Sequence, residues 1–229
     1  MKKIQFAALY LCFFALSCGK SGNPSPATGS VDKYMSTTTG STWTYDVITN
    51  PGTAGSTVAI DIVSVSGTDT TVEQGTANQR IYRILKHTNG NVSDYYNITG
   101  SDYYRFQTLP LNNVKIQNIY LKDNAPVGTT WSQTVNVTVA GLGVVPIIVA
   151  NSIVEKGINK TVNGINYNNV ITVKTDLSTS LSPGAIISDI KSFYAPKIGL
   201  IQGDYKVTVA LASVNINIQT LLKTSVIVP

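Results

Sequence analysis

The chain has 229 residues, 43% of them hydrophobic, and a formal net charge of +5, a composition that supports a folded protein with a sizeable core. Its Lys and Arg residues are scattered, so the sequence lacks the basic stripe that follows a phosphate backbone. Composition and charge therefore argue against nucleic acid as a partner.

The first residues have the layout of an export signal. Lys2 and Lys3 precede a mostly apolar run, Ile4–Leu16, which is too short for a permanent helix across a bilayer, since that needs ~20 residues. The segment Ala15–Cys18 resembles a lipobox, in which cleavage occurs before the cysteine and its thiol carries acyl chains such as palmitate. We expect lipidation of Cys18. An ordinary secretory signal cut nearby and an uncleaved anchor remain open alternatives.

This interpretation divides the chain into a signal peptide (1–17), a flexible tether (18–32) and a single domain (33–229). The tether is rich in Gly, Ser and Pro and would reach at most roughly 45 Å. Acidic residues just after the cysteine mark surface display in some bacterial lipoproteins, and here none follows directly. We expect an outer-membrane lipoprotein of the bacterial cell envelope that faces the periplasm, with the membrane as partner through its lipid anchor.

Removing the signal changes the charge and the thiol count. Of the 17 basic residues Lys2 and Lys3 leave, so 15 remain against 12 acidic ones, a formal charge of +3. Cys12 leaves with the signal and Cys18 carries lipid, so we expect no thiol for a disulfide, a metal or a nucleophile.

Beyond the tether, the chain is rich in Val, Ile, Thr and Tyr and shows no long apolar pattern at helical spacing. Alternation in 57–63 predicts a strand with Val58, Ile60 and Ile62 on one buried face. The run 205–211 has a similar pattern. Further strands are predicted at 81–85, 92–96, 114–121, 131–139, 144–154, 170–176, 188–194 and 216–228.

One predicted strand is apolar on both faces. Residues 144–149 read VVPIIV, so we expect this segment to be buried on both faces or to be covered by a neighbouring segment. Pro146 indicates the start of the strand or the edge of a sheet.

Turn signals predict how the strands pair. Asn89-Gly90, Thr99-Gly100 and Asn163-Gly164 are typical of tight hairpins, because these residues tolerate positive φ. Consecutive hairpins give an antiparallel meander, and no helical crossover for a parallel sheet is evident. We predict an all-β fold in which the meander forms a curled sheet or half-barrel. A β-sandwich is the alternative.

Two short repeats contain aromatic residues. Gly40–Trp43 reads GSTW and Gly128–Trp131 reads GTTW, each at the start of a predicted strand. The two tryptophans, Trp43 and Trp131, either anchor the core or line a cavity for an apolar ligand.

The second repeat is SDYY, at 93–96 and 101–104. A two-residue loop at Thr99-Gly100 would place Tyr96 opposite Tyr103 and Tyr95 opposite Tyr104, one pair on each face. These pairs serve either cross-strand packing or, on one face, a platform for a sugar or lipid.

Candidates for catalysis are few. His87 is the only histidine, and Asp94 could face it only diagonally across a hairpin, so we expect His87 near solvent and outside any triad. The carboxylates are spread singly, which leaves a glycosidase-like pair from distant strands open. We expect no catalytic residue, no metal site and no cofactor, and hence no enzyme.

The segments Gly40–Tyr45 (GSTWTY) and Phe193–Ile201 (FYAPKIGLI), with the Tyr-rich hairpin, resemble an uncharacterised family of Bacteroidota lipoproteins with GxxWxY and YAxxxGLV-like motifs. The resemblance implies a curled antiparallel sheet similar to the half-barrels of lipoprotein carriers. The second repeat departs from the motif, because Ser132 and Gln133 follow Trp131. No catalytic residue is implied.

Three hypotheses for function follow. A non-catalytic module would bind an apolar or amphipathic ligand on the concave face of the sheet. A structural or assembly protein would dock on another envelope protein. An extracytoplasmic hydrolase with a carboxylate pair is the third and least supported.

Overall fold

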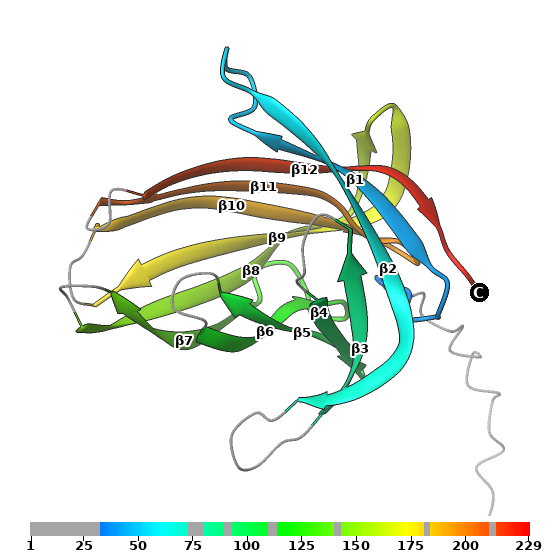
Figure 1. The fold of residues 1–229 in the computed structure, drawn as a ribbon, viewed down its shortest axis with the longest axis horizontal. Coiled ribbons are helices and arrows are strands. Elements are labelled where there is room, and N and C mark those ends of the chain that lie inside the picture. Colours follow the sequence, from blue (N-terminus) through cyan, green and yellow to red (C-terminus); the bar gives the residue numbers. More distant parts are fainter. Residues whose placement is uncertain are drawn as a thin grey trace, which may run out of the picture. The chain divides into compact units, whose positions relative to one another are not determined.

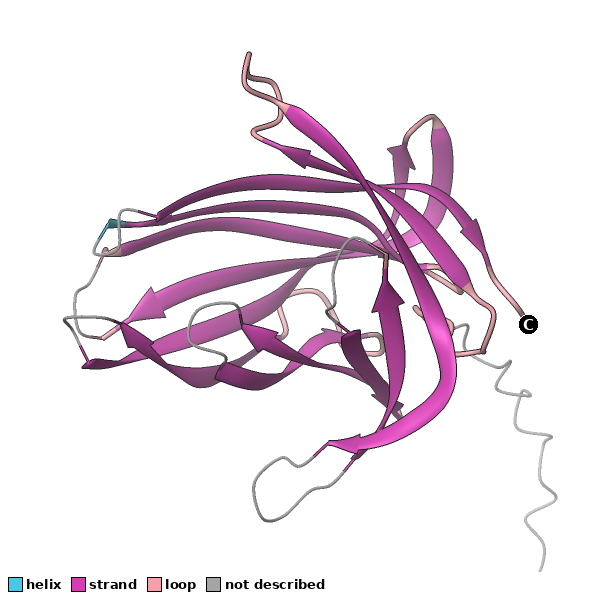
Figure 2. Ribbon diagram, viewed as in Figure 1, coloured by secondary structure: helices cyan, strands magenta, loops and turns pink. Residues whose placement is uncertain are grey.

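The structure is a computed structural model that describes residues 33–72, 80–88, 93–109, 114–139, 143–180, 184–210 and 214–229. Asp32–Pro229 forms one compact unit, and it contains every residue of the core. Its regular structure is almost entirely strand (Figure 2). The strands are β1 (Thr42–Thr49), β2 (Thr57–Val72), β3 (Arg80–His87), β4 (Ser93–Thr99), β5 (Asp102–Leu109), β6 (Val114–Lys122), β7 (Thr130–Val139), β8 (Gly143–Val162), β9 (Ile165–Thr179), β10 (Ile186–Ala195), β11 (Gly199–Val209) and β12 (Val214–Val226).

The strands form one antiparallel sheet in the order β6-β5-β4-β3-β2-β1-β12-β11-β10-β9-β8-β7. Neighbours in the sheet are neighbours in the chain, apart from β1 and β12, which pair in the middle. The sheet curls until its edge strands β6 and β7 approach one another (Figure 1). The predicted all-β curled meander is thus confirmed, and a single sheet replaces the sandwich alternative. No helix among the described residues is long and apolar enough to span a bilayer.

The inner face is the face of the sheet that carries the core. It is defined by Trp43 and Tyr45 on β1, Ile201 on β11 and Leu222 on β12, all less than a tenth exposed. Aliphatic and aromatic burial of this kind stabilises the sheet, because each fully buried large side chain contributes about 1.5–3 kcal/mol.

The two motif segments of the sequence meet on this face. The Trp43 indole donates a hydrogen bond of 2.7 Å to the Ile198 carbonyl, and the Tyr45 hydroxyl donates one of 3.0 Å to the Leu200 carbonyl. The spacing of Trp and Tyr in the first motif thus matches two carbonyl acceptors in the second. This contact explains the motifs as structural features.

Two hairpins test the turn predictions. Asn163 and Gly164 have φ values of 47° and 79° and join β8 to β9 where Val162 pairs with Ile165, as a type I′ turn requires. The hairpin predicted at Thr99-Gly100 lies one residue later. Thr99 pairs with Asp102, so the loop is Gly100-Ser101, and Gly100 has a φ of 61°. Asn89-Gly90 lies outside the described residues, although β3 and β4 on either side pair antiparallel.

The shifted loop overturns the predicted tyrosine pairs. Tyr96 pairs with Arg105 and Tyr95 with Phe106, because Thr99 remains in the strand and moves every pairing by two positions. Tyr103 instead pairs with Ile98. Glycine at the first loop position suits a type II′ turn, which accounts for the shift.

The predicted face of β2 is also wrong. Val58, Ile60 and Ile62 are 62%, 39% and 39% exposed. The register with β1 places Val63 opposite Trp43 and Asp61 opposite Tyr45, so the odd-numbered residues lie on the inner face. Packing against the β1 aromatics, rather than the local pattern, decides the register.

The prediction that both faces of β8 are covered near its start is also wrong. Val144 and Ile148 are 61% and 36% exposed, so only the face that carries Val145 is buried. Pro146 lies near the start of the strand, as predicted, but β8 lies between β7 and β9 rather than at an edge.

Edge strands β6 and β7 are joined near one end by side chains. The Trp131 indole on β7 donates a hydrogen bond of 2.7 Å to the Ile119 carbonyl on β6. Asn151 on β8 donates a longer bond of 3.4 Å to the same carbonyl. The Lys122 ammonium lies 5.9 Å from the Trp131 ring centroid. We call this junction the β6–β7 seam.

Candidate functional site

A row of charged side chains crosses the inner face from β2 to β5. The register places His87 of β3 opposite Val63 of β2, and Asp94 of β4 opposite Leu85 of β3, so both residues share the inner face with Asp61. The row is Asp61, His87, Asp94 and Arg105, which we call the charged cluster.

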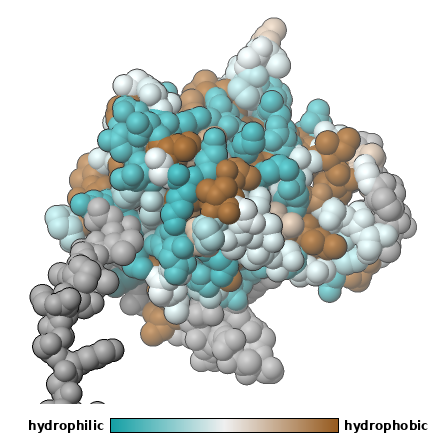
Figure 3. Space-filling model, turned by 180° about the vertical axis from the view of Figure 1, so that it is seen from behind, coloured by the Kyte–Doolittle hydropathy of each residue, from teal (hydrophilic) through white to brown (hydrophobic). Residues whose placement is uncertain are grey.

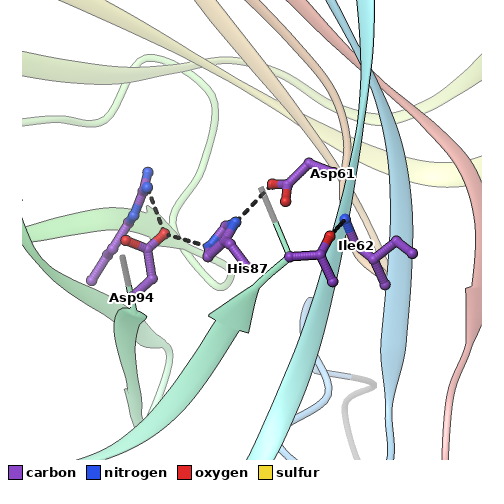
Figure 4. A network of polar contacts seen from close by, with 6 residues as sticks. Asp61, Ile62, His87 and Asp94 are labelled. Carbon is purple, nitrogen blue, oxygen red and sulfur yellow. Dashed lines mark hydrogen bonds and ion pairs between the residues drawn. The ribbon is translucent and has the colours of Figure 1, made fainter. Parts of the chain in front are cut away.

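His87 connects two carboxylates (Figure 4). Its Nδ1 lies 2.7 Å from Asp61 Oδ2, and its Nε2 lies 3.3 Å from Asp94 Oδ2. The neighbouring Thr88 hydroxyl accepts a 3.0 Å hydrogen bond from the Ile62 amide, which fixes the end of β3 against β2. Both ring nitrogens therefore face carboxylate oxygens, an arrangement that suits the protonated imidazole.

Arg105 completes the cluster. Its Nη2 donates a 2.6 Å hydrogen bond to Asp94 Oδ2. The Asp94 side chain is only 5% exposed, whereas that of Arg105 keeps 35% of its surface exposed. Asp94 is thus a buried carboxylate with two cationic partners, and Arg105 presents part of its guanidinium to solvent on the inner face.

The partners shift the pKa values in opposite directions. The hydrogen bond to Asp94 raises the pKa of His87 above its usual 6.5, Asp61 adds to this, and burial opposes it. Burial acts to raise the pKa of Asp94, but Arg105 and His87 outweigh it and hold that pKa below its usual value. The cluster therefore favours a charged Asp94 and a protonated His87.

The guanidinium lies beside the first of three tyrosines that contact one another in a row. The Arg105 Cζ lies 5.9 Å from the Tyr96 ring centroid, and Tyr120 makes edge or tilted contacts with Tyr96 and Tyr194 at 5.5 Å. Burial raises the pKa of all three phenols. They stay neutral at physiological pH and can donate hydrogen bonds.

An aliphatic surface shares the inner face with the charged cluster. Its side chains lie on β8 to β12 and point to the same side of the sheet as the core residues of these strands. We call this surface the apolar wall, and it consists of Ile147, Val149, Leu177, Ile190, Val207 and Ile218. Ile190 and Val207 are buried, and the other four are only partly buried. One face of the sheet thus combines apolar and charged side chains.

The structure separates the predicted ligand-binding residues. Trp43, Tyr96 and Tyr103 lie on the inner face, and Tyr103 is fully buried with its hydroxyl donating a 2.6 Å bond to Asp123. Tyr95 lies on the opposite face, against Phe106 at 5.8 Å between ring centroids. Tyr104, two residues before Phe106, shares that outer face.

Trp131 lies at the β6–β7 seam. Cys18 lies outside the described residues, so its lipidation stays a prediction.

Sequence reasoning missed two members of the cluster, Asp61 and Arg105, and did not link Asp94 to either of them. Asp61, Asp94 and Arg105 come from three strands and meet only through the register. The diagonal approach of Asp94 to His87 was expected and is confirmed, but His87 is 23% exposed and paired rather than a residue near solvent. The charge of Asp61 in an otherwise apolar alternation was the one local signal.

The outer face carries a shallow polar pocket of about 260 Å³ over β10 to β12. Asp189, Lys191, Asp204 and Lys206 alternate in charge along its lining. Among the residues that the structure describes, no group of three or more His, Cys, Asp or Glu is placed to hold a metal ion.

No protein-family model and no curated protein matches this chain. One solved structure that it resembles is that of a "putative lipoprotein" from Parabacteroides distasonis ATCC 8503, with 11% sequence identity and a TM-score of 0.47. The alignment covers 85% of this chain and 99% of that one. A similarity this low carries no argument about function.

Proposed function

We propose that this chain is a membrane-anchored, non-catalytic lipoprotein of the cell envelope that binds an apolar or amphipathic ligand on the inner face of its sheet. The observation that carries the proposal is the inner face itself, on which the partly buried apolar wall and the partly exposed Arg105 share one surface. Apolar surface with a few placed polar groups is typical of small-molecule sites.

The non-catalytic part of the proposal is supported by the carboxylates. Asp61 and Asp94 each place one oxygen against His87, and Asp94 also accepts from Arg105. Asp94 is therefore engaged and charged, whereas a glycosidase acid needs a raised pKa.

Native mass spectrometry of Asp32–Pro229 purified without detergent tests ligand binding. This unit contains the whole core and therefore has what it needs to fold alone. We expect a co-purifying lipid. Repeated recovery of empty protein that also fails to take up added amphiphiles would refute the binding function.

The anchor needs a separate test. Cys18→Ser in the full chain should move the protein from the membrane fraction to the soluble fraction without unfolding it. Membrane association equal to that of the natural chain would refute lipid anchoring at Cys18.

A second candidate function, docking on another envelope protein, is favoured by the outer face. Val58, Ile60 and Ile62 form an exposed apolar stripe along β2, and Figure 3 shows other hydrophobic patches within a mostly hydrophilic surface. Serine at Val58 and Ile60 should abolish a cross-link to a partner in intact cells. An unchanged cross-linking pattern would exclude this stripe as the docking surface.

A further inference from the structure

We propose that the inner face binds the anionic head group of a single-chain amphiphile at Arg105, and that protonation of His87 strengthens this binding. The inference rests on the proposed function and adds the charge and the position of the ligand's head group.

Arg105 has donors to spare. Nη2 donates to Asp94, and Nε is buried without a hydrogen-bond partner in the described part of the chain, so an incoming anion would meet the Nη1 and Nη2 end of the guanidinium. A guanidinium offers five N–H donors, and its planar fork matches carboxylate, sulfonate and phosphate oxygens. With 35% of the side chain still exposed, an anion can reach it from the inner face.

A second cation lies on the same face. Arg83 of β3 is opposite Tyr96 of β4, and Tyr96 is opposite Arg105 of β5, so the three residues form a row across three strands. Directly opposite residues point to the same side of a sheet. Arg83 has an acidic residue, Asp69 of β2, opposite it, so Arg105 is the cation on which the proposal rests.

His87 controls the local charge. The charged groups that face it are Asp61 from β2, Asp94 from β4 and, beyond Asp94, Arg105 from β5. With His87 neutral, Asp61 and Asp94 outweigh Arg105 by one negative charge, and protonation of His87 removes this excess.

Protonated His87 also holds Asp94 from the side opposite Arg105, which weakens the competition of that carboxylate with an incoming anion. The raised pKa of His87 extends its protonated state to higher pH than that of an ordinary imidazole.

The apolar wall provides for the rest of the ligand. Its side chains lie on β8 to β12, on the same face as Arg105 but on strands of the other half of the sheet. Burial of an alkyl chain is favourable for every methylene removed from water, so the tail supplies affinity while Arg105 selects the charge of the head group.

The test uses calorimetry on Asp32–Pro229 with three probes. Decane-1-sulfonate keeps its charge from pH 5.5 to 9, decyl methyl sulfone is its neutral counterpart, and inorganic phosphate lacks the tail. We expect the sulfonate to bind more tightly than the sulfone and phosphate to bind only weakly. The affinity for sulfonate should fall as the pH rises from 6 to 9.

Four variants locate the effect. Arg105→Gln should weaken sulfonate binding roughly tenfold or more and leave sulfone binding unchanged. His87→Gln should remove the pH dependence. Asp94→Asn should strengthen sulfonate binding, a gain that misfolding cannot produce. Lys86→Gln, which removes an exposed cation next to His87 on the outer face, is the matched control and should change neither affinity.

The outcomes separate the two proposals. If both amphiphiles bind but Arg105→Gln and Asp94→Asn leave sulfonate affinity at the level of the Lys86→Gln control, the anionic site is wrong and the binding function stands. Binding of phosphate as tight as that of sulfonate, or pH-independent sulfonate binding, would also overturn the inference. If neither amphiphile binds, the proposed function fails as well.

Discussion

Trp131 on β7 donates its indole hydrogen bond to the carbonyl of Ile119 on β6, and these two strands are the opposite edges of one sheet. The bond therefore links the first strand of the sheet order to the last. Among the described residues, Asn151 of the neighbouring β8 adds weaker bonds to Asn118 and Ile119 of β6, and Lys122 of β6 approaches the indole.

Trp131→Phe should loosen this seam. The variant loses the 2.7 Å indole bond and leaves the Ile119 carbonyl with the 3.4 Å bond from Asn151, so we expect a loss of about 1 kcal/mol in the free energy of unfolding. Amide hydrogen exchange should accelerate along β6 and β7. Trp43→Phe, which removes a similar bond to the turn between β10 and β11, away from the seam, should lower stability without this local effect. Equal exchange at the edges in both variants would contradict the role of Trp131.

Gly203→Ala should be destabilising because of Tyr205. A Cβ at Gly203 would lie 2.5 Å from Cε2 and 2.9 Å from the hydroxyl oxygen of Tyr205, so the ring must move. We expect a cost of about 1–3 kcal/mol, typical of overpacking, measured by urea unfolding.

Two controls accompany the Gly203 experiment. Gly55→Ala, where a Cβ meets no atom within 4 Å, should cost far less. In a Tyr205→Leu background the cost at Gly203 should largely disappear, as a double-mutant cycle would show. A cost that persists without the tyrosine ring would point to the backbone instead.

Stability should depend on pH through His87. Because its folded-state pKa is raised, its contribution is fully present below about pH 6.5 and is lost as the pH rises through the folded-state value. The free energy of unfolding of the natural chain should therefore exceed that of His87→Gln by more at pH 6 than at pH 9. Asp94, whose pKa is lowered, stays charged across this range and does not confuse the comparison. A pH-independent difference would show that His87 does not titrate as described.

Two valines on one strand test the faces of β2. Val63 is 6% exposed on the inner face and Val58 is 62% exposed on the outer face. Val63→Ala should cost about 1–3 kcal/mol by leaving a cavity, whereas Val58→Ala should stay within about 0.5 kcal/mol of the natural chain. Thermal unfolding of the two variants measures the contrast. If Val58→Ala destabilised the protein more than Val63→Ala, the buried face of β2 would be the one that the sequence pattern predicts.

Much of the fold follows from local chemistry. Alternating β-branched residues and turn dipeptides predict the meander, and Asn163-Gly164 adopts the positive φ values that its turn requires. The motif residues Trp43 and Tyr45 were recognisable, although their carbonyl partners 155 residues away were not. Strands and turns can be predicted from short stretches of sequence, because side-chain alternation and turn dipeptides act between residues that are close in the chain.

The candidate site was not predictable in the same way. Asp61 looked like a solvent-facing residue between Ile60 and Ile62, and only the pairing of β2 with β1 turns it inward. A shift of one residue in the Gly100 turn likewise placed Arg105, rather than Tyr103, beside Tyr96. Register decides which side chains meet, and a single residue of error moves every one of them.

The order of the strands leaves the first and last of them, β1 and β12, hydrogen-bonded at the centre, while the discontinuity falls between two strands that are consecutive in the chain. Among the described residues, separation of β6 from β7 would therefore break the side-chain bonds to the Ile119 carbonyl and leave the pairing of the other neighbouring strands in place.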